Sequence, residues 1–128
     1  MHIMKENTQI VIDFYEFLKT AKYEQAFELL HPEFELVQAE TLPYGGVYKG
    51  KEGVQLFFKK LFDYFETFGS EDVTYLSNED KVVATSIAVG LTKQKEAFRM
   101  PMVQVYTLEN EKILRTMPFY YDTGKFKT

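Results

Sequence analysis

The sequence predicts an α+β fold in which a curved, mainly antiparallel sheet packs against three helices from the first half of the chain. In that half, apolar residues recur at three- and four-residue steps, as they do along one face of a helix. Beyond Gly69 they alternate with polar residues, as they do along strands. The stretch 42–50, LPYGGVYKG, divides the two halves. Helices and strands segregated along a chain are typical of α+β domains.

Two helices are predicted before the first strand. From Asn7 to Ala21 the apolar side chains share one face, and Asn7 or Thr8 is suited to cap the helix. A shorter helix is predicted from Tyr23 to Leu30, because Pro32 disfavours its continuation. The short link between them predicts an αα-hairpin.

A strand at 34–39 and a third helix are predicted on either side of the glycine-rich stretch. The third helix is expected to start near Lys51 and to stop at Gly69. Its stripe is formed by Val54, Phe57, Phe58, Leu61, Phe65 and Phe68. Such a stripe is more typical of a packed core than of a cofactor site.

Four further strands are predicted, at 73–76, 82–91, 97–108 and 113–122. Short polar turns separate them, which predicts antiparallel neighbours with the strand at 34–39 added at an edge. At 128 residues the chain is predicted to be one domain, with an ordered core over 7–122 and a polar tail over 123–128.

Composition excludes several classes of site and partner. The chain has no cysteine, so it has no disulfide, thiolate nucleophile or cysteine-ligated metal. Its formal charge is −4 and its lysines are dispersed among acidic residues, which argues against a nucleic-acid partner. Its start lacks a secretory signal, and no apolar run reaches the ~18 residues of a membrane span. We therefore expect a soluble, cytoplasmic protein without a membrane partner.

Several phrases of the sequence resemble one superfamily. They are FYEFL at 14–18, LLHP at 29–32 and PYGGVYKG at 43–50, in the predicted order of elements. They resemble nuclear transport factor 2-like (cystatin-like) proteins, and within that group the SnoaL-like and ketosteroid isomerase-related domains. The resemblance covers 7–122. It implies a cone-shaped sheet that wraps around the helices, an apolar cavity open at one end, and a homodimer formed through the sheet.

The resemblance does not carry over the catalytic residues of either group. Ketosteroid isomerase uses an aspartate base with a tyrosine and a protonated aspartate as hydrogen-bond donors. Paired without gaps, the tyrosine corresponds to Phe14 and the base to Gln38, and neither side chain can do that work. The strand from Phe98 to Thr107 has no carboxylate, and Pro118 lies about where SnoaL-type cyclases place an acid.

Glu40 and His31 are the candidate catalytic residues. In an extended strand Glu40 shares a face with Gln38, and an apolar cavity there would suit its carboxylate to acid–base chemistry. The alternative is a surface glutamate, the commoner position. His31 could act as a base, or it could bind the last carbonyls of the second helix. With His2 near the terminus, no spacing predicts a metal site, and no cofactor is predicted.

Ten residues are predicted to contact a ligand. Tyr44 and Tyr48 could present hydroxyls at the cavity or plug the wide end of the cone. The row of Met102, Gln104 and Tyr106 either lines the cavity or forms a dimer surface, because both faces of that strand are apolar. Phe119 shares this ambiguity. The full set is Phe14, Leu18, Gln38, Tyr44, Tyr48, Phe58, Met102, Gln104, Tyr106 and Phe119.

These observations together predict a domain that binds a small hydrophobic molecule in an apolar cone. Isomerases, cyclases, dehydratases and non-catalytic binders share such folds, so fold alone does not choose among them. An enzyme of this kind would be cofactor-free and would use general acid–base chemistry, with Glu40 as acid or base and Gln38 or a tyrosine as its partner. The alternatives are a non-catalytic ligand-binding module and a dimeric interaction protein whose own aromatic side chains fill the cone.

Overall fold

The computed structural model describes residues 6–127, so His2 lies outside the described residues. Its helices are α1 (Asn7–Lys19), α2 (Tyr23–Glu28) and α3 (Gly50–Tyr64). Its strands are β1 (Leu30–Gln38), β2 (Gly46–Lys49), β3 (Phe65–Asn78), β4 (Lys81–Thr92), β5 (Ala97–Glu109) and β6 (Lys112–Tyr120). A short 3-10 helix, Thr123–Lys125, follows. Each described helix is too short or too polar to cross a membrane.

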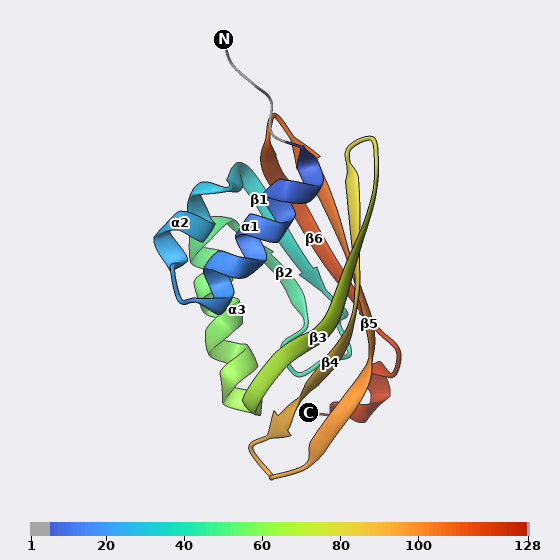
Figure 1. The fold of residues 1–128 in the computed structure, drawn as a ribbon. Helices are drawn as coiled ribbons and strands as arrows, with labels where there is room; N and C mark the ends of the chain where they lie inside the picture. Colours follow the sequence, from blue (N-terminus) through green and yellow to red (C-terminus); the bar gives the residue numbers. More distant parts are fainter. Residues whose placement is uncertain (1–5, 128) are drawn as a thin grey trace.

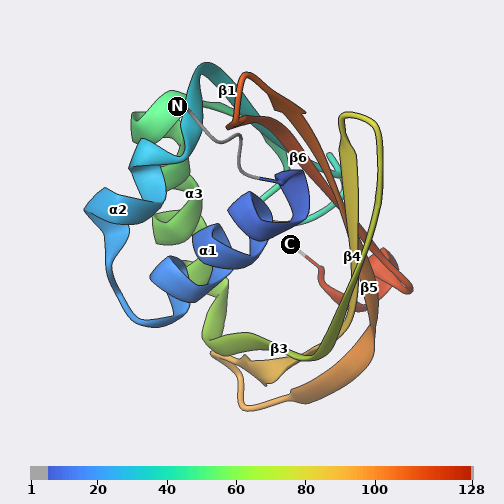
Figure 2. The ribbon, with the colours of Figure 1, turned by 45° about the horizontal axis from the view of Figure 1, so that its top comes forward.

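The six strands form one sheet in the order β2-β1-β6-β5-β4-β3. All neighbours are antiparallel except β1 and β6, which run parallel. The sheet is bent, and the three helices lie on its concave face while no α-helix covers the other face (Figures 1 and 2). This arrangement confirms the predicted α+β cone.

Alternation along the strands decides which side chains face the helices. On β5 the buried positions are Phe98, Met100, Met102, Tyr106 and Leu108, at every second residue. Val103 and Val105 therefore point to the outer face. The row of Met102, Gln104 and Tyr106 faces inward, which resolves the ambiguity that the sequence left open.

The chain leaves α2 earlier than predicted. The helix ends at Glu28, and β1 begins at Leu30, which pairs with Ile113 of β6. Pro32 lies inside this strand. It is tolerated because β2 pairs only with residues 35–38 and the β1–β6 register shifts before Glu35, so no ladder hydrogen bond from the Pro32 nitrogen is needed.

The third helix also ends earlier than predicted, at Tyr64 instead of Gly69. Phe65 and Phe68 belong to β3, where a register irregularity between Phe65 and Thr67 lets both rings turn toward the core. The three-residue spacing of Phe65 and Phe68 fits a helix equally well, and pairing with β4 makes this segment a strand. Strand β2 was not predicted. It begins at Gly46 and ends at Lys49, just before Gly50, and both glycines have a positive φ.

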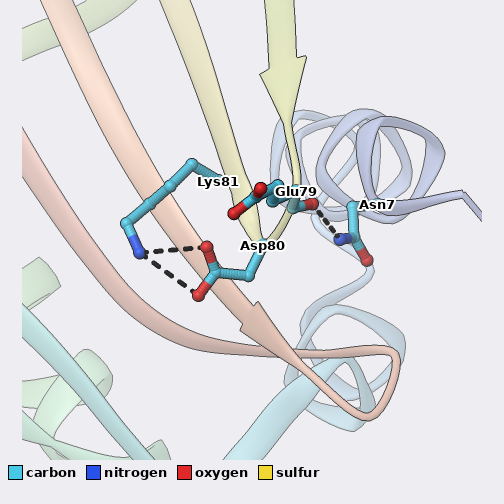
Figure 3. Close-up of polar contacts among 4 residues, drawn as sticks. All are labelled: Asn7, Glu79, Asp80 and Lys81. Atoms are coloured by element: carbon cyan, nitrogen blue, oxygen red, sulfur yellow. Dashed lines mark hydrogen bonds and ion pairs between the residues drawn. The ribbon is translucent and has the colours of Figure 1, made fainter.

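The start of α1 is bound to the β3–β4 turn instead of being capped by its own side chain. Glu6 occupies the N-cap position and makes no side-chain cap, so the prediction of Asn7 or Thr8 as the cap is wrong. The Asn7 amide donates to the Glu79 carbonyl oxygen at 3.2 Å (Figure 3). Next to it, Lys81 pairs with Asp80 at 3.2 Å. The Asn7 contact joins the helix to the turn, and the exposed ion pair, which lies at the turn, contributes little stability.

Gly90 is required by close packing and provides a test of the fold. An alanine Cβ there would collide with the Thr67 carbonyl oxygen and lie 2.8 Å from the Phe98 ring. We expect Gly90→Ala to lower the free energy of unfolding by about 1 to 3 kcal/mol, measured by chemical denaturation. Gly69→Ala is the matched control, because open space surrounds that position and the change should be neutral or slightly stabilising. Equal destabilisation by both would contradict this packing.

Candidate ligand-binding cavity

A cavity of about 830 Å³ lies between the helices and the concave face of the sheet. This volume is in the range of pockets that hold small organic molecules. Side chains from α1, α2, α3, β1, β3, β5 and β6 line it, so elements from the whole chain meet there. The described chain therefore encloses real space and does not fill its cone with its own aromatic residues.

The walls of the cavity are mostly apolar. They include Phe14 and Leu18 from α1 and Phe57, Phe58 and Leu61 from α3, with Phe34, Leu36 and Met102 on the sheet. Amphipathic helices place these side chains together, because their apolar stripes face the sheet. The result is a surface that favours an apolar occupant.

The exposed lining residues mark the mouth. Those on the helices are Lys19, Tyr23, Glu24, Gln55 and Phe62, from the ends of α1 and α2 and one side of α3, and Gly69 of β3 is also exposed. Lys19 and Glu24 carry the only formal charges among the described lining residues. The Glu24 carboxylate points to solvent and pairs with Lys51 at 3.2 Å. The interior is therefore free of formal charge over the described chain.

Polar groups gather on the floor, where three neighbouring strands meet. Thr116 of β6 lies between Leu36 of β1 and Tyr106 of β5. Gln38 is two residues beyond Leu36 and Gln104 two residues before Tyr106, so both occupy the next row of the same face. The Tyr106 hydroxyl donates to Gln104 Oε1 at 2.7 Å. A polar band thus crosses an otherwise apolar floor.

Two buried atoms in this band have no hydrogen-bond partner. They are Gln38 Oε1 and Thr116 Oγ1, on side chains that are 4% and 5% exposed. A buried polar atom without a partner costs about 1 to 3 kcal/mol, and folded proteins keep few of them. Both atoms belong to residues that line the cavity, although each atom is itself covered, so a rotation of either side chain would bring its polar atom to an occupant.

Burial raises the pKa of two cavity tyrosines, Tyr106 and Tyr120. Beyond burial, the neighbouring Tyr75 and Tyr15 raise the pKa of Tyr106 further. Burial raises the pKa of Tyr120 to about 12. At neutral pH these phenols are therefore neutral groups that can donate a hydrogen bond, and neither is a base.

The matching family model is the SnoaL-like domain, over residues 11–116. This chain belongs to the SnoaL-like domain family. A search of curated proteins found no match.

Solved structures with the same fold are numerous but distant in sequence. An NTF2-like protein of unknown function from Burkholderia pseudomallei K96243 is 18% identical, with a TM-score of 0.86 over 95% of each chain. TerC, co-crystallised with polyporic acid, is 17% identical, with a TM-score of 0.83 over 93% of this chain and 94% of TerC. A candidate polyketide cyclase from Xanthomonas campestris pv. campestris is 14% identical, with a TM-score of 0.76 over 94% and 93% of the two chains. At these identities the likeness shows the fold.

The SnoaL-like domain brings seven of the ten predicted ligand contacts to the cavity. They are Phe14, Leu18, Gln38, Phe58, Met102, Gln104 and Tyr106. Tyr44 and Tyr48 are buried but lie outside the cavity lining, and the Tyr48 hydroxyl donates to the Tyr44 carbonyl oxygen at 2.9 Å. Phe119 is 52% exposed on the outer face of β6. Both loop tyrosines therefore pack the closed end of the domain.

Neither predicted catalytic residue lies in the cavity. Glu40 is exposed in the turn after β1, because the strand ends at Gln38 and the alternation that aligned the two residues stops there. His31 lies on β1, where its Nδ1 accepts from the Glu33 backbone nitrogen at 3.0 Å and its Nε2 pairs with Glu109 at 2.8 Å. It does not bind the carbonyls of α2. The expectation that Glu40 shares the cavity face with Gln38 is wrong, and a role for His31 as a base stays a prediction.

Thr116 and Tyr120 were missed as site residues. The last strand was recognised in the sequence, but its inward face was not identified. Once Met102 and Gln104 are known to face inward, their pairing with Tyr120 and Pro118 assigns the same face to Thr116. The missing information was which face of β5 lines the cavity, because the inward residues of β6 follow from it by register.

The buried Tyr120 predicts a loss of stability at alkaline pH. Its pKa rises from 10.0 to about 12 on folding, so the folded chain holds this proton more tightly than the unfolded chain. The resulting stabilisation is complete below about pH 10 and is lost as the pH rises toward about 12. We expect unfolding midpoints in guanidinium to fall over this range, less steeply for Tyr120→Phe. Tyr121→Phe, at a side chain 81% exposed, should keep the wild-type slope.

Proposed function

We propose that this SnoaL-like domain binds a small, largely apolar molecule that carries a hydroxyl or carbonyl group. The observation that carries the proposal is the pair of unpartnered atoms, Gln38 Oε1 and Thr116 Oγ1, in an otherwise apolar cavity. A ligand hydroxyl can donate to the amide oxygen of Gln38. The Thr116 hydroxyl can donate to a carbonyl or accept from a donor.

In the proposed complex, apolar contacts provide affinity and polar contacts provide orientation. Apolar walls supply affinity in proportion to the surface they remove from water, at roughly 25 cal/mol per Å². The polar band supplies orientation, because few of its hydrogen bonds can be made at once by a ligand in the wrong pose. Neutral Tyr106 adds a fixed phenol whose hydroxyl is already directed at Gln104. A ligand with one polar edge and one apolar end fits this division.

The charge-free interior favours binding over acid–base catalysis. Over the described chain no carboxylate or imidazole lines the inner cavity, and Tyr106 and Tyr120 are protonated at neutral pH. A group that abstracts a proton from carbon is therefore missing from the wall. The second candidate is a cofactor-free isomerase, cyclase or dehydratase, which the structural likeness to candidate polyketide cyclases supports. It would rely on the Thr116 hydroxyl, which has no hydrogen-bond partner, to polarise a carbonyl.

Substitutions of the two unpartnered residues test the binding proposal. Thermal shift should identify a ligand from a panel of apolar ketones, lactones, sterols, aromatic polyketides and polyporic acid. We expect Thr116→Val and Gln38→Leu to weaken its binding about tenfold each, by calorimetry. Both should raise the stability of the ligand-free protein by about 1 kcal/mol, because each removes a buried polar atom without a partner. Assays of turnover on the same ligand separate a binder from an enzyme.

The control is Thr74→Val, which makes the same change at an exposed position of β3. It should leave affinity unchanged. A loss of both stability and binding in Thr116→Val would mean that Thr116 serves the fold. No stabilisation by any compound in the panel would contradict the proposed function.

We also propose that the outer face of the sheet joins two copies in a homodimer. Thr85, Arg99 and Arg115 share the outward face of β4, β5 and β6 with a larger apolar group: Val83, Ile87, Val89, Val103, Val105, Met117 and Phe119. Phe119 is 52% exposed in a single chain, and no α-helix of the described chain covers the convex face of the sheet (Figure 1). An exposed apolar patch of this extent supports a protein interface. A second copy offers the same patch to a two-fold contact.

A charge placed on the outer face tests the dimer. Phe119→Lys should shift the protein from dimer to monomer in sedimentation velocity, because the ammonium group would be buried without a partner. Leu56→Lys is the matched control, since Leu56 is 47% exposed on α3, on the helical side of the sheet. It should leave the dimer intact. A wild-type protein that sediments as a monomer at every concentration would refute this interface.

A further inference from the structure

We propose that Phe126, near the C-terminus, sets the depth of the cavity and thereby the length of ligand that it accepts. The inference rests on the proposed ligand binding and adds a specificity-determining residue that does not line the cavity. It starts from an unexpected feature of residues 123–128, which the sequence presents as a polar tail. Phe126 is only 2% exposed, whereas its neighbours Gly124, Lys125 and Lys127 are exposed.

The ring of Phe126 lies behind the side chains that close one end of the cavity. Tyr120 and Phe68 line that end, with ring centroids 6.4 Å apart. The Phe126 centroid is 5.8 Å from that of Tyr120 and 5.0 Å from that of Phe65, which is itself 5.0 Å from Phe68. Phe126 therefore braces both lining rings, one directly and one through Phe65.

A second space lies on the far side of this layer of rings. A cavity of about 170 Å³ is bordered by Phe98 and Phe126, whose centroids are 4.9 Å apart, and by charged residues that include Asp63 and Lys93. Removing the Phe126 ring would leave Tyr120 free to move toward that space. The large cavity would then deepen at this end, since a packed wall would have lost its support.

Local hydrogen bonds hold the Phe126 backbone in position. Its nitrogen donates to the Thr123 carbonyl oxygen at 3.2 Å, and the next nitrogen, of Lys127, donates to the Tyr64 hydroxyl at 3.1 Å. Before this turn, the Tyr121 nitrogen donates to the Pro101 carbonyl oxygen at 3.0 Å. The segment is thus tied down on both sides of one buried ring, so substitution of that ring alone isolates its effect.

Strand geometry gives the length of ligand that Phe126 would limit through Tyr120. Thr116 and Tyr120 are four residues apart on β6 and face the same side. Four residues of strand span roughly 13 Å. A ligand whose polar end binds at Thr116 and whose apolar tail points along β6 therefore meets Tyr120 after about that length.

Alkyl esters of 4-hydroxybenzoic acid, from methyl to decyl, supply the test ligands. Each has a phenol, an ester carbonyl and a tail of chosen length. In the wild type, each added methylene that enters apolar space should tighten binding about fourfold until the tail meets Tyr120. The break is the ester length beyond which affinity stops rising. In Phe126→Ala the break should move to longer esters by at least one methylene, while the methyl ester binds within about twofold of wild type.

Controls separate a change of depth from a change of stability. Tyr121→Ala removes an exposed neighbouring ring and should leave the break where the wild type has it. If Phe126→Ala does not fold, Phe126→Leu replaces it and should also move the break to longer esters. An unchanged break in a folded Phe126 variant would overturn the inference while leaving the proposed binding intact. Failure of every ester to bind the wild type would overturn both.

Discussion

Parallel pairing of β1 with β6 is the contact on which the rest of this domain depends. It joins the helical half of the chain to the end of the β3–β6 meander, and it places Leu36 beside Thr116. Strand β1 follows α2 after one residue, and β2 leads directly into α3. The positions of β1 and β2 in the sheet therefore determine where α2 and α3 lie on its concave face. The β1–β6 pairing thus positions both the sheet side and the helical side of the cavity.

The cavity exists because the helices cannot follow the bend of the sheet. On the concave face, β4 presents the small buried side chains Ala84, Ser86 and Ala88, and α1, which buries Ile10 and Val11, packs against this strand. Straight helices that rest on a strongly bent sheet leave space where the two surfaces diverge. Aromatic rings close one end of that space, while the ends of α1 and α2 leave the other open. The polar band lies between these ends, out of contact with bulk water.

Sequence patterns predicted the elements whose apolar residues fit only one periodicity. They misassigned residues whose spacing fits both a helix and a strand. The alternation in β4 and β5 is unambiguous, and both strands lie close to their predicted bounds. Phe65 and Phe68 suited a helix and a bulged strand equally, so only pairing with β4 could decide between them. Of the seven predicted contacts that line the cavity, three lie on helices and four on strands. Glu40 failed because a strand that ends at Gln38 carries no alternation beyond it, and strand ends depend on tertiary pairing.

An interior with hydrogen-bonding groups but no charge discriminates in a particular way. A pocket that is only apolar separates ligands weakly, since one methylene is worth about 0.8 kcal/mol. A wall that contains Gln38 Oε1 and Thr116 Oγ1 without partners discriminates more strongly, because an analogue without the matching group leaves both atoms buried and unsatisfied. The empty state then carries a cost that only a matching occupant removes. Selectivity in this domain would accordingly reside in two uncharged side chains on β1 and β6, the same strands whose pairing builds the fold.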